Sequence, residues 1–274
     1  MLTRAAFAEH FASRAVFGMV HLLPLPGSPL FASMEAVIEA ALRDARALAA
    51  GGCSAIVFEN FGDRPFAKGR VEAETVASFT RVVADVVREV RVPFGINVLR
   101  NDAQSALAIA AATGASFIRV NVHTGVMVTD QGIVEGDAYT TMRKRASLAP
   151  RVHVFADHLV KHAAPLAELE PLQVAKDLRL RGLADALIVT GAETGAAADP
   201  ARLRALREAL PDAPLLVGSG LTEENARSFA DADGAIVGTS IKQDGRVDAP
   251  VDTGRVERIV QAFCGWPSAS RFRG

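Results

Sequence analysis

The sequence predicts an α/β fold, a single (β/α)8 or TIM barrel built from eight strand–helix units. Three observations favour this fold. The chain has 274 residues, which suits one barrel domain. Short, continuously apolar runs alternate with helical patterns, as in a parallel sheet that helices cover on both sides. Two Gly-rich loops follow the last two apolar runs, and in such barrels these loops form the usual phosphate site.

Eight apolar runs are the expected barrel strands. Each is short and ends at a polar or turn-forming residue, as buried parallel strands do. A doubly wound open sheet is the alternative, but no Gly-x-Gly-x-x-Gly motif follows the first run, which weighs against a dinucleotide-binding fold. In chain order the expected strands are residues 17–22, 55–60, 94–99, 117–122, 152–157, 186–190, 214–217 and 235–237.

Helical patterns fill most of the gaps between these runs. Ser33 is the expected N-cap of an Ala-rich helix that ends before Gly51. Asp199 and Pro200 form an N-cap and first-turn pair of the kind that begins a helix. The expected helices cover residues 34–50, 71–90, 103–113, 171–181, 200–210 and 252–263, and Thr222 is expected to open a further short helix.

One long segment, residues 123–146, interrupts this alternation before the fifth strand. Segments of this length in a compact domain are usually functional or partly structured. We expect residues 124–136 to form a loop that could act as a lid and exclude water from a bound ligand.

Composition excludes several classes of function. The formal net charge is −1 and no long run of one sign occurs, so nothing indicates binding to nucleic acid or to an anionic membrane. No run approaches the roughly 18 apolar residues of a transmembrane helix, and the short run 15–20 lacks a signal-peptide cleavage site. Cys53 and Cys264 form neither a metal motif nor a disulfide framework. We therefore expect a cytoplasmic protein with one domain over residues 1–274 and a barrel core at about 16–264.

Polar side chains gather where the expected strands end, which is the active-site face of such a barrel. The carboxyl ends of the strands meet at one mouth, so we expect these side chains to converge there. Candidates for general acid–base catalysis are Glu59, His123, Asp157 and His158. Candidate substrate-binding residues at the same strand ends are His21, Asn60, Asn97 and Asn121.

Several of these residues also have a structural interpretation. His21 could be a core histidine with its hydrogen bonds satisfied, and the asparagines could fix loops. A charged residue inside a barrel strand is costly unless it is paired, so Arg119 could be a buried partner of Glu59 or Asp157.

The two Gly-rich loops are the candidate phosphate site. Small residues allow backbone N–H groups to point at an anion, and a helix N-terminus adds its positive dipole end. Turns between a strand and a helix also need glycine for purely structural reasons. The candidate phosphate-binding residues are Gly218, Ser219 and Gly220 after the seventh strand, and Gly238, Thr239 and Lys242 after the eighth.

Lysines and metal ligands are less well defined by the sequence. Lys161 and Lys242 are possible cations for an anionic substrate, but neither lies in an apolar strand that would lower its pKa for Schiff-base chemistry. A divalent metal could bind among His21, Glu59, His123, Asp157 and His158. However, the first strand carries Val-His-Leu instead of His-x-His and no HExxH motif occurs, so no metal ligand is assigned and no cofactor is firmly implied.

Several longer segments resemble the BtpA/SgcQ family. The matching segments are GMVHLLPLPGSP, AIVFENFGD, GINVLRND, FIRVNVHTGVMVTDQGIVEG, VFADHLVKHA, GSGLT and GTSIK, and the resemblance extends from about residue 16 to 263. It implies a TIM barrel similar to those of phosphate-binding enzymes. The family takes its name from a cyanobacterial factor linked to photosystem I biogenesis or stability, and some members lie beside sugar-phosphate genes.

Three functions therefore remain open at this point. The first is an isomerase or lyase of a phosphorylated sugar or phosphoribosyl compound, because moving a proton beside an anchored phosphate needs no redox cofactor. The second is a non-catalytic biogenesis or stability factor for a membrane protein complex. The third is a metal-dependent hydrolase of nucleosides or nucleotides. A homo-oligomer is possible because Ala-rich helix faces permit close packing, although the same composition suits helices packed on a barrel.

Overall fold

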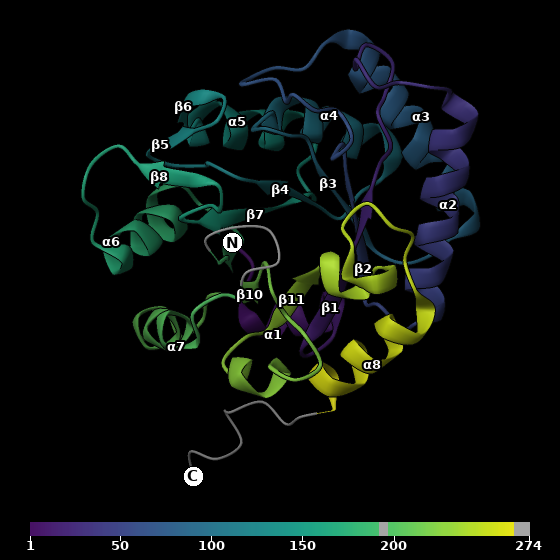
Figure 1. Ribbon diagram of the computed structural model, residues 1–274. Helices are drawn as coiled ribbons and strands as arrows, with labels where there is room; N and C mark the ends of the chain where they lie inside the picture. Colours follow the sequence, from purple (N-terminus) through teal and green to yellow (C-terminus); the bar gives the residue numbers. More distant parts are fainter. Residues whose placement is uncertain (192–196, 266–274) are drawn as a thin grey trace.

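The computed structural model describes residues 1–191 and 197–265, which form a closed parallel barrel surrounded by helices (Figure 1). All eight expected strands are confirmed. Neighbouring strands pair in the order β1-β11-β10-β9-β7-β4-β3-β2, and every pair is parallel. The barrel strands are β1 (Ala15–His21), β2 (Ala55–Glu59), β3 (Phe94–Asn97), β4 (Phe117–Val120), β7 (His153–His158), β9 (Ala186–Val189), β10 (Leu215–Val217) and β11 (Gly234–Val237).

The helices pack on the outer face of the barrel. Side-chain caps start most of them, and Ser33, Asp102 and Asp199 each accept a hydrogen bond from a first-turn backbone N–H, as the sequence predicts for Ser33 and Asp199. The helices are α2 (Met34–Ala50), α3 (Ala73–Glu89), α4 (Ala103–Thr113), α5 (Ala138–Leu148), α6 (Pro171–Lys176), α7 (Pro200–Ala209) and α8 (Thr253–Cys264).

Two of the expected helices differ from the prediction. The helix expected after Thr222 is a single 3-10 turn, η2 (Ala226–Phe229). The Asn225 side chain explains this, because its amide bonds both Thr222 N and Gly220 O and so fixes a turn in place of helical backbone bonds. The helix expected over residues 171–181 is α6 followed by a π-helical turn, η1 (Asp177–Arg181).

The long segment before β7 is not a loop. It forms a hairpin of β5 (Val126–Thr129) and β6 (Gly132–Glu135), followed by α5. The hairpin pairs with β8 (Ala163–Pro165), which lies after β7, so the three strands make a small antiparallel sheet beside the barrel. Val122, Met127, Val134 and Val160 give this sheet its own small apolar core. Closure of this hairpin over a ligand remains a prediction.

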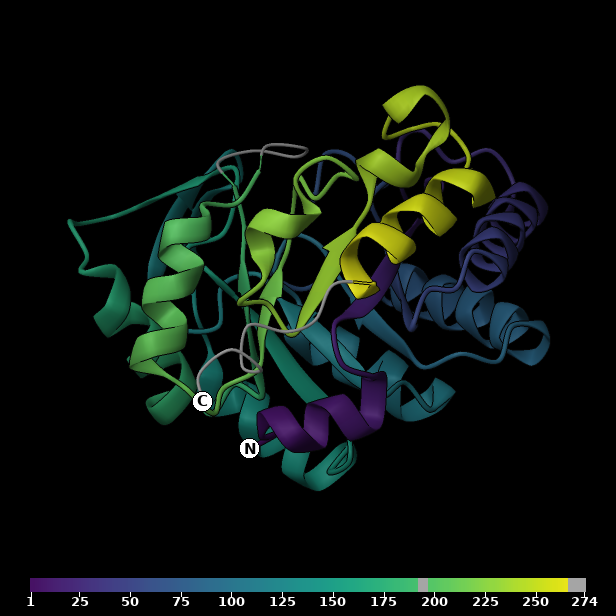
Figure 2. The same ribbon diagram turned by 90° about the horizontal axis from the view of Figure 1, so that it is seen from below.

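Phenyl rings fill the half of the barrel interior that lies toward the N-terminal ends of the strands. Phe17, Phe117 and Phe155 point inward, and the rings of Phe117 and Phe155 stack with centroids 4.5 Å apart. An N-terminal helix that the sequence analysis missed, α1 (Arg4–Phe11), crosses the end at which the strands begin (Figure 2). Its Phe7 and Phe11 are buried against these rings and close that end of the barrel.

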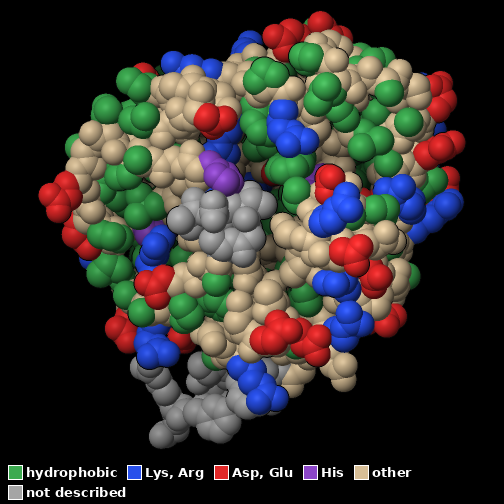
Figure 3. All heavy atoms as spheres, viewed as in Figure 1, with side chains coloured by type: hydrophobic (Ala, Val, Ile, Leu, Met, Phe, Trp, Pro, Cys, Tyr) green, Lys and Arg blue, Asp and Glu red, His purple; other side chains and the backbone are tan. Residues whose placement is uncertain are grey.

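The surface shows mixed charge. Positive and negative side chains are interspersed on the face drawn in Figure 3, in keeping with a net charge of −1. Among the described residues no helix is both long and apolar enough to span a bilayer.

The aromatic closure leads to a first prediction. Replacing Phe7, which is fully buried, by alanine leaves a cavity under the barrel and should lower the free energy of unfolding by about 3–5 kcal/mol. Chemical denaturation would measure this loss. The matched control is Phe31→Ala, because the Phe31 side chain is 37% exposed and its loss should cost much less. Equal losses for the two variants would contradict the proposed role of α1.

Candidate active site

A buried ion pair crosses the middle of the barrel. Alternation along a strand puts Arg119 on the same inward face as Phe117, and Asp157 on the same face as Phe155. Arg119 donates from Nε and Nη2 to the two carboxylate oxygens of Asp157, both at 2.9 Å, and their side chains are 3% and 0% exposed. Of the two partners considered for Arg119, the structure selects Asp157.

Two asparagines complete this polar layer. Asn121 Nδ2 donates to Asp157 Oδ2 at 2.9 Å, and Asn97 Nδ2 donates to Asn121 Oδ1 at 3.2 Å. Both oxygens of Asp157 therefore already accept hydrogen bonds from buried donors. Asp157, Asn97 and Asn121 converge as expected, but they do not line the pocket beside the Gly-rich loops, and Asn121 and Asp157 line a separate cavity next to the small sheet.

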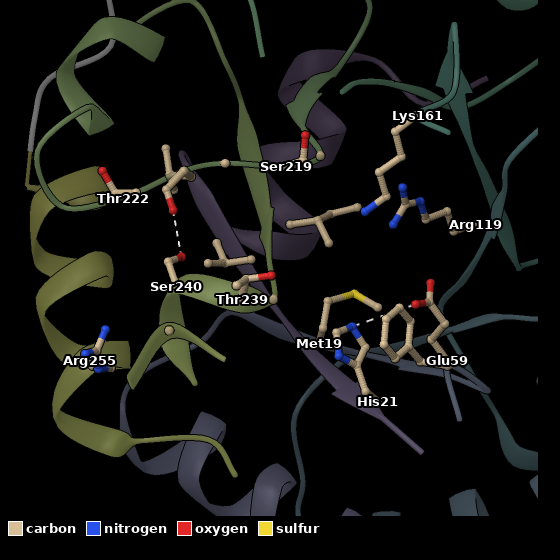
Figure 4. Close-up of a pocket in the computed structure, with 18 residues that line it drawn as sticks. Met19, His21, Glu59, Arg119, Lys161, Ser219, Thr222, Thr239, Ser240 and Arg255 are labelled. Carbon is tan, nitrogen blue, oxygen red and sulfur yellow. Dashed lines mark hydrogen bonds and ion pairs between the residues drawn. The ribbon is translucent and has the colours of Figure 1, made fainter. Parts of the chain in front are cut away.

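A pocket of about 310 Å³ lies above this layer, at the carboxyl ends of the strands (Figure 4). One wall consists of the Gly-rich loops after β10 and β11 together with Arg255 of α8. The opposite wall carries the ionisable and aromatic side chains of β1, β2 and β4 and of the loops after β2 and β7, namely His21, Glu59, Phe61, Arg119 and Lys161.

His21 and Glu59 form a close pair on this second wall. His21 Nε2 lies 3.7 Å from Glu59 Oε1, and the imidazole stacks on the Phe61 ring with centroids 4.4 Å apart. Burial, with the positive charges of Lys242 and Lys161, lowers the pKa of His21 to about 3, so the imidazole is neutral near pH 7. Burial also raises the pKa of Glu59, although Arg119 and Lys161 oppose that shift. A carboxyl group whose pKa is raised holds a proton more readily and is a candidate for general acid–base catalysis.

Lys161 reaches the pocket from the loop after β7. Burial lowers the pKa of its ammonium, and the nearby Arg119 lowers it further. Lys161 does not lie in an apolar strand, as the sequence indicates, but its loop leaves the residue only half-exposed at the barrel mouth, so its pKa is lowered all the same. Arg100 Nη2 donates to the backbone oxygen of Lys161 at 2.8 Å and holds this part of the loop in place.

Hydrogen bonds join the two Gly-rich loops to each other and to Gly191, which follows β9. Ser240 Oγ donates to Leu221 O at 2.7 Å, while Ser219 Oγ accepts from Gly191 N at 2.7 Å. Gly218 has no room for a side chain, because a Cβ there would lie 2.3 Å from Ile188 Cγ2. The predicted residues Gly218, Ser219, Gly220, Gly238 and Thr239 all line the pocket.

Four predicted site residues lie elsewhere. Lys242 is 1% exposed, and its Nζ pairs with Asp44 Oδ2 at 2.8 Å. The carboxylate of Asp44 therefore balances its charge, and the prediction that its side chain faces the pocket is wrong. The Nε2 atom of His123 lies 2.8 Å from Gly182 O, and the Nε2 atom of His158 lies 2.8 Å from Pro171 O. Asn60 fixes a loop, because its Oδ1 accepts from Leu99 N and its Nδ2 donates to Asp63. None of the four lines the pocket.

The cation beside the Gly-rich loops is Arg255, which the sequence analysis missed. Asp252 caps α8 by accepting from the backbone N of Arg255, which places this arginine in the first turn. A positive side chain there opposes the positive end of the helix dipole, so its position is unfavourable for the helix itself. That mismatch in the sequence Asp-Thr-Gly-Arg is the feature that could have identified it.

The ion pair at the base of the mouth leads to a second prediction. Asp157→Asn leaves the Arg119 charge buried without its counterion and should lower the free energy of unfolding by about 3–5 kcal/mol. Combining Arg119→Met with Asp157→Leu should cost far less than the two single changes added together. The control is a double-mutant cycle on the exposed pair Arg81 and Asp85, with an expected coupling of about 0.3–0.5 kcal/mol. Additive effects at Arg119 and Asp157 would exclude the pairing.

Glu59 leads to a third prediction, on pH dependence. Because burial raises the folded-state pKa of Glu59, the folded protein keeps a proton that the unfolded chain has already lost. The free energy of unfolding of the wild type should therefore fall as pH rises from the ordinary glutamate pKa through the raised value. Glu59→Gln removes this pH dependence. The free energy of unfolding of the variant should therefore rise relative to that of the wild type by about 1.4 kcal/mol for each pH unit between the two pKa values. Denaturation across this pH range tests the gain, with exposed Glu257→Gln as control, and a pH-independent difference would refute it.

Comparisons with known proteins give the relationship of this chain. The BtpA family model matches residues 12–264. Photosystem I biogenesis protein BtpA of Synechocystis is 45% identical over 250 residues, with 90% of this chain and 87% of that protein covered. The sgc region protein SgcQ of Escherichia coli is 33% identical, with 90% and 93% covered. N-(5'-phosphoribosyl)anthranilate isomerase from Pyrococcus furiosus shares the barrel fold at 13% identity, with a TM-score of 0.57 over 92% of this chain and 100% of that one. The chain is a member of the BtpA family.

Proposed function

We propose that this chain is an enzyme that binds a phosphorylated sugar or phosphoribosyl compound and acts on it as an isomerase or lyase. The observation that carries the proposal is the construction of one pocket from two unlike walls. Backbone groups and an arginine form one wall, and a tuned carboxyl group beside a neutral imidazole lies in the other. Such a pocket can hold an anion at one end while protons move at the other.

The phosphate end of the pocket is the pair of Gly-rich loops. In (β/α)8 barrels the loops after the last two strands commonly bind phosphate through backbone N–H groups. Here Gly220 and Gly238 keep the backbone accessible, whereas the Gly218 N–H already donates to Val189 O, and Arg255 supplies a full positive charge. The hydrogen bond from Ser240 to Leu221 preorganises the two loops, so less ordering is needed on binding.

The chemical end of the pocket is the pair of Glu59 and His21. Glu59 can take a proton from a carbon next to a carbonyl group and return it to a neighbouring atom, which is the step shared by sugar isomerases and many lyases. The neutral imidazole of His21 can donate or accept a hydrogen bond at the substrate oxygen. The nearby Arg119 guanidinium favours negative charge that develops there.

The similarities give limited support to each candidate function. The name of the Pyrococcus enzyme refers to a phosphoribosyl compound, but at 13% identity the likeness supports the fold alone. The name of the Synechocystis relative favours the second candidate, a non-catalytic factor in the biogenesis of a membrane protein complex. The pair of Glu59 and His21 favours the enzyme, because a scaffold gains nothing from a buried carboxyl group and imidazole in the mouth of the barrel.

A ligand screen gives the fourth prediction. A phosphosugar or phosphoribosyl compound at one hundred times its dissociation constant should add roughly 2.7 kcal/mol to the free energy of unfolding, which appears as a thermal shift. Arg255→Met should weaken binding of that ligand about tenfold, since it removes a charge-assisted contact to phosphate. The matched control is Arg258→Met on the same helix, because Arg258 is exposed, pairs with Glu223 and does not line the pocket.

The same screen separates the candidate functions. Within the described residues no group of three or more His, Cys, Asp or Glu side chains is placed to hold a metal ion, and the screen is run with and without divalent metals to test for one directly. Equal loss of binding in the Arg255 and Arg258 variants would argue against the phosphate site. Silence from every phosphorylated compound under both conditions would favour the assembly factor.

A further inference from the structure

Two cationic side chains stand together at the end of the pocket opposite the Gly-rich loops. In Figure 4 the Lys161 ammonium and the Arg119 guanidinium lie close to each other, and both line the pocket. The two residues come from different elements, since Arg119 belongs to β4 and Lys161 to the loop after β7. Like charges placed side by side repel each other, so their proximity needs an explanation.

Lys161 has no direct partner at this end of the pocket within the part of the chain that the structure describes. Asp157 neutralises Arg119 through two hydrogen bonds, but Lys161 makes no side-chain hydrogen bond or ion pair among residues 1–191 and 197–265. Glu59 is the one carboxylate among the described residues that line this pocket, and it lies against His21. A charge that is partly removed from water is costly unless it is paired, and Lys161 has only the longer-range attraction of Glu59 and Asp157.

The position of Lys161 is nevertheless fixed. Arg100, itself buried, binds the Lys161 backbone oxygen, and β8 begins two residues later and is paired with β5. An exposed lysine with no function would not need its backbone fixed by contacts of this kind. Here the surrounding chain holds an unpaired cation over a pocket, which is the arrangement of an anion-binding group.

We propose that Lys161, with the free edge of the Arg119 guanidinium, binds a second oxyanion of the substrate, a carboxylate or a second phosphate. This inference rests on the proposed function, because it assumes that the Gly-rich loops hold the first phosphate. The substrate class is then a phosphorylated compound with an acidic group at each end. The carbon chain between the two anions passes Glu59 and His21, where its protons are exchanged.

Matched pairs of compounds test the second anion. The dissociation constants of ribose 5-phosphate and ribulose 1,5-bisphosphate are compared by calorimetry, and glycerol 3-phosphate is compared with 3-phosphoglycerate for the carboxylate. In the wild type the compound with two anions should bind roughly tenfold or more tightly than its partner in at least one pair. Lys161→Met should abolish that preference and change binding of the monophosphates less than twofold, whereas Lys161→Arg should retain most of it.

The control variant is Lys176→Met, which removes the same charge from an exposed position at the end of α6. Thermal unfolding of each variant shows whether it is folded. If the monophosphates bind but a second anion adds nothing in either pair, or if Lys161→Met weakens both members of a pair equally, this inference is wrong and the proposed function stands. If no phosphorylated compound binds at all, the proposed function itself fails.

Discussion

The buried ion pair between Arg119 and Asp157 is the constraint on which the rest of the barrel interior depends. Two charges removed from water destabilise a fold unless their geometry is nearly complete. Here the guanidinium meets both carboxylate oxygens, and Asn121 supplies a further donor. The pair divides the interior into two halves. Below it are the phenyl rings that α1 closes off, and above it is a polar mouth whose floor cannot shift without exposing or separating a charge.

Most of the architecture could be predicted from the sequence, because it follows from local patterns. Apolar runs ended by polar or small residues predicted all eight barrel strands, and the caps Ser33 and Asp199 predicted where two helices begin. The features that were missed depend on contacts between distant segments. α1 has a local signal in its N-cap Thr3, which the sequence analysis overlooked, but its burial depends on the contact of Phe7 with Phe155, and the small sheet depends on the pairing of β5 with β8. No local pattern shows either contact.

The candidate site shows the same limit at the level of single residues. Strand alternation is enough to bring His21 and Glu59 to the mouth, and the glycines of both loops followed from their position after the last strands. Lys242 was assigned to the phosphate because it is near a loop in the sequence, but its side chain turns to Asp44 on α2. Distance along the chain does not give the direction of a long side chain. Arg255 is the cation that lines the pocket beside these loops, and only its unfavourable position in the first turn of α8 distinguished it in the sequence.

The small sheet formed by β5, β6 and β8 has a consequence for how such barrels diverge. β8 follows Lys161 closely, and the hairpin tip lies outside the barrel ladder. Substitutions or insertions in this hairpin can therefore move the segment that carries Lys161 while the register of the barrel strands stays the same. Changes in the hairpin can thus occur separately from changes in the barrel strands. Homologues can retain the same barrel mouth and change the shape of its rim through an appendage that contributes nothing to closing the barrel.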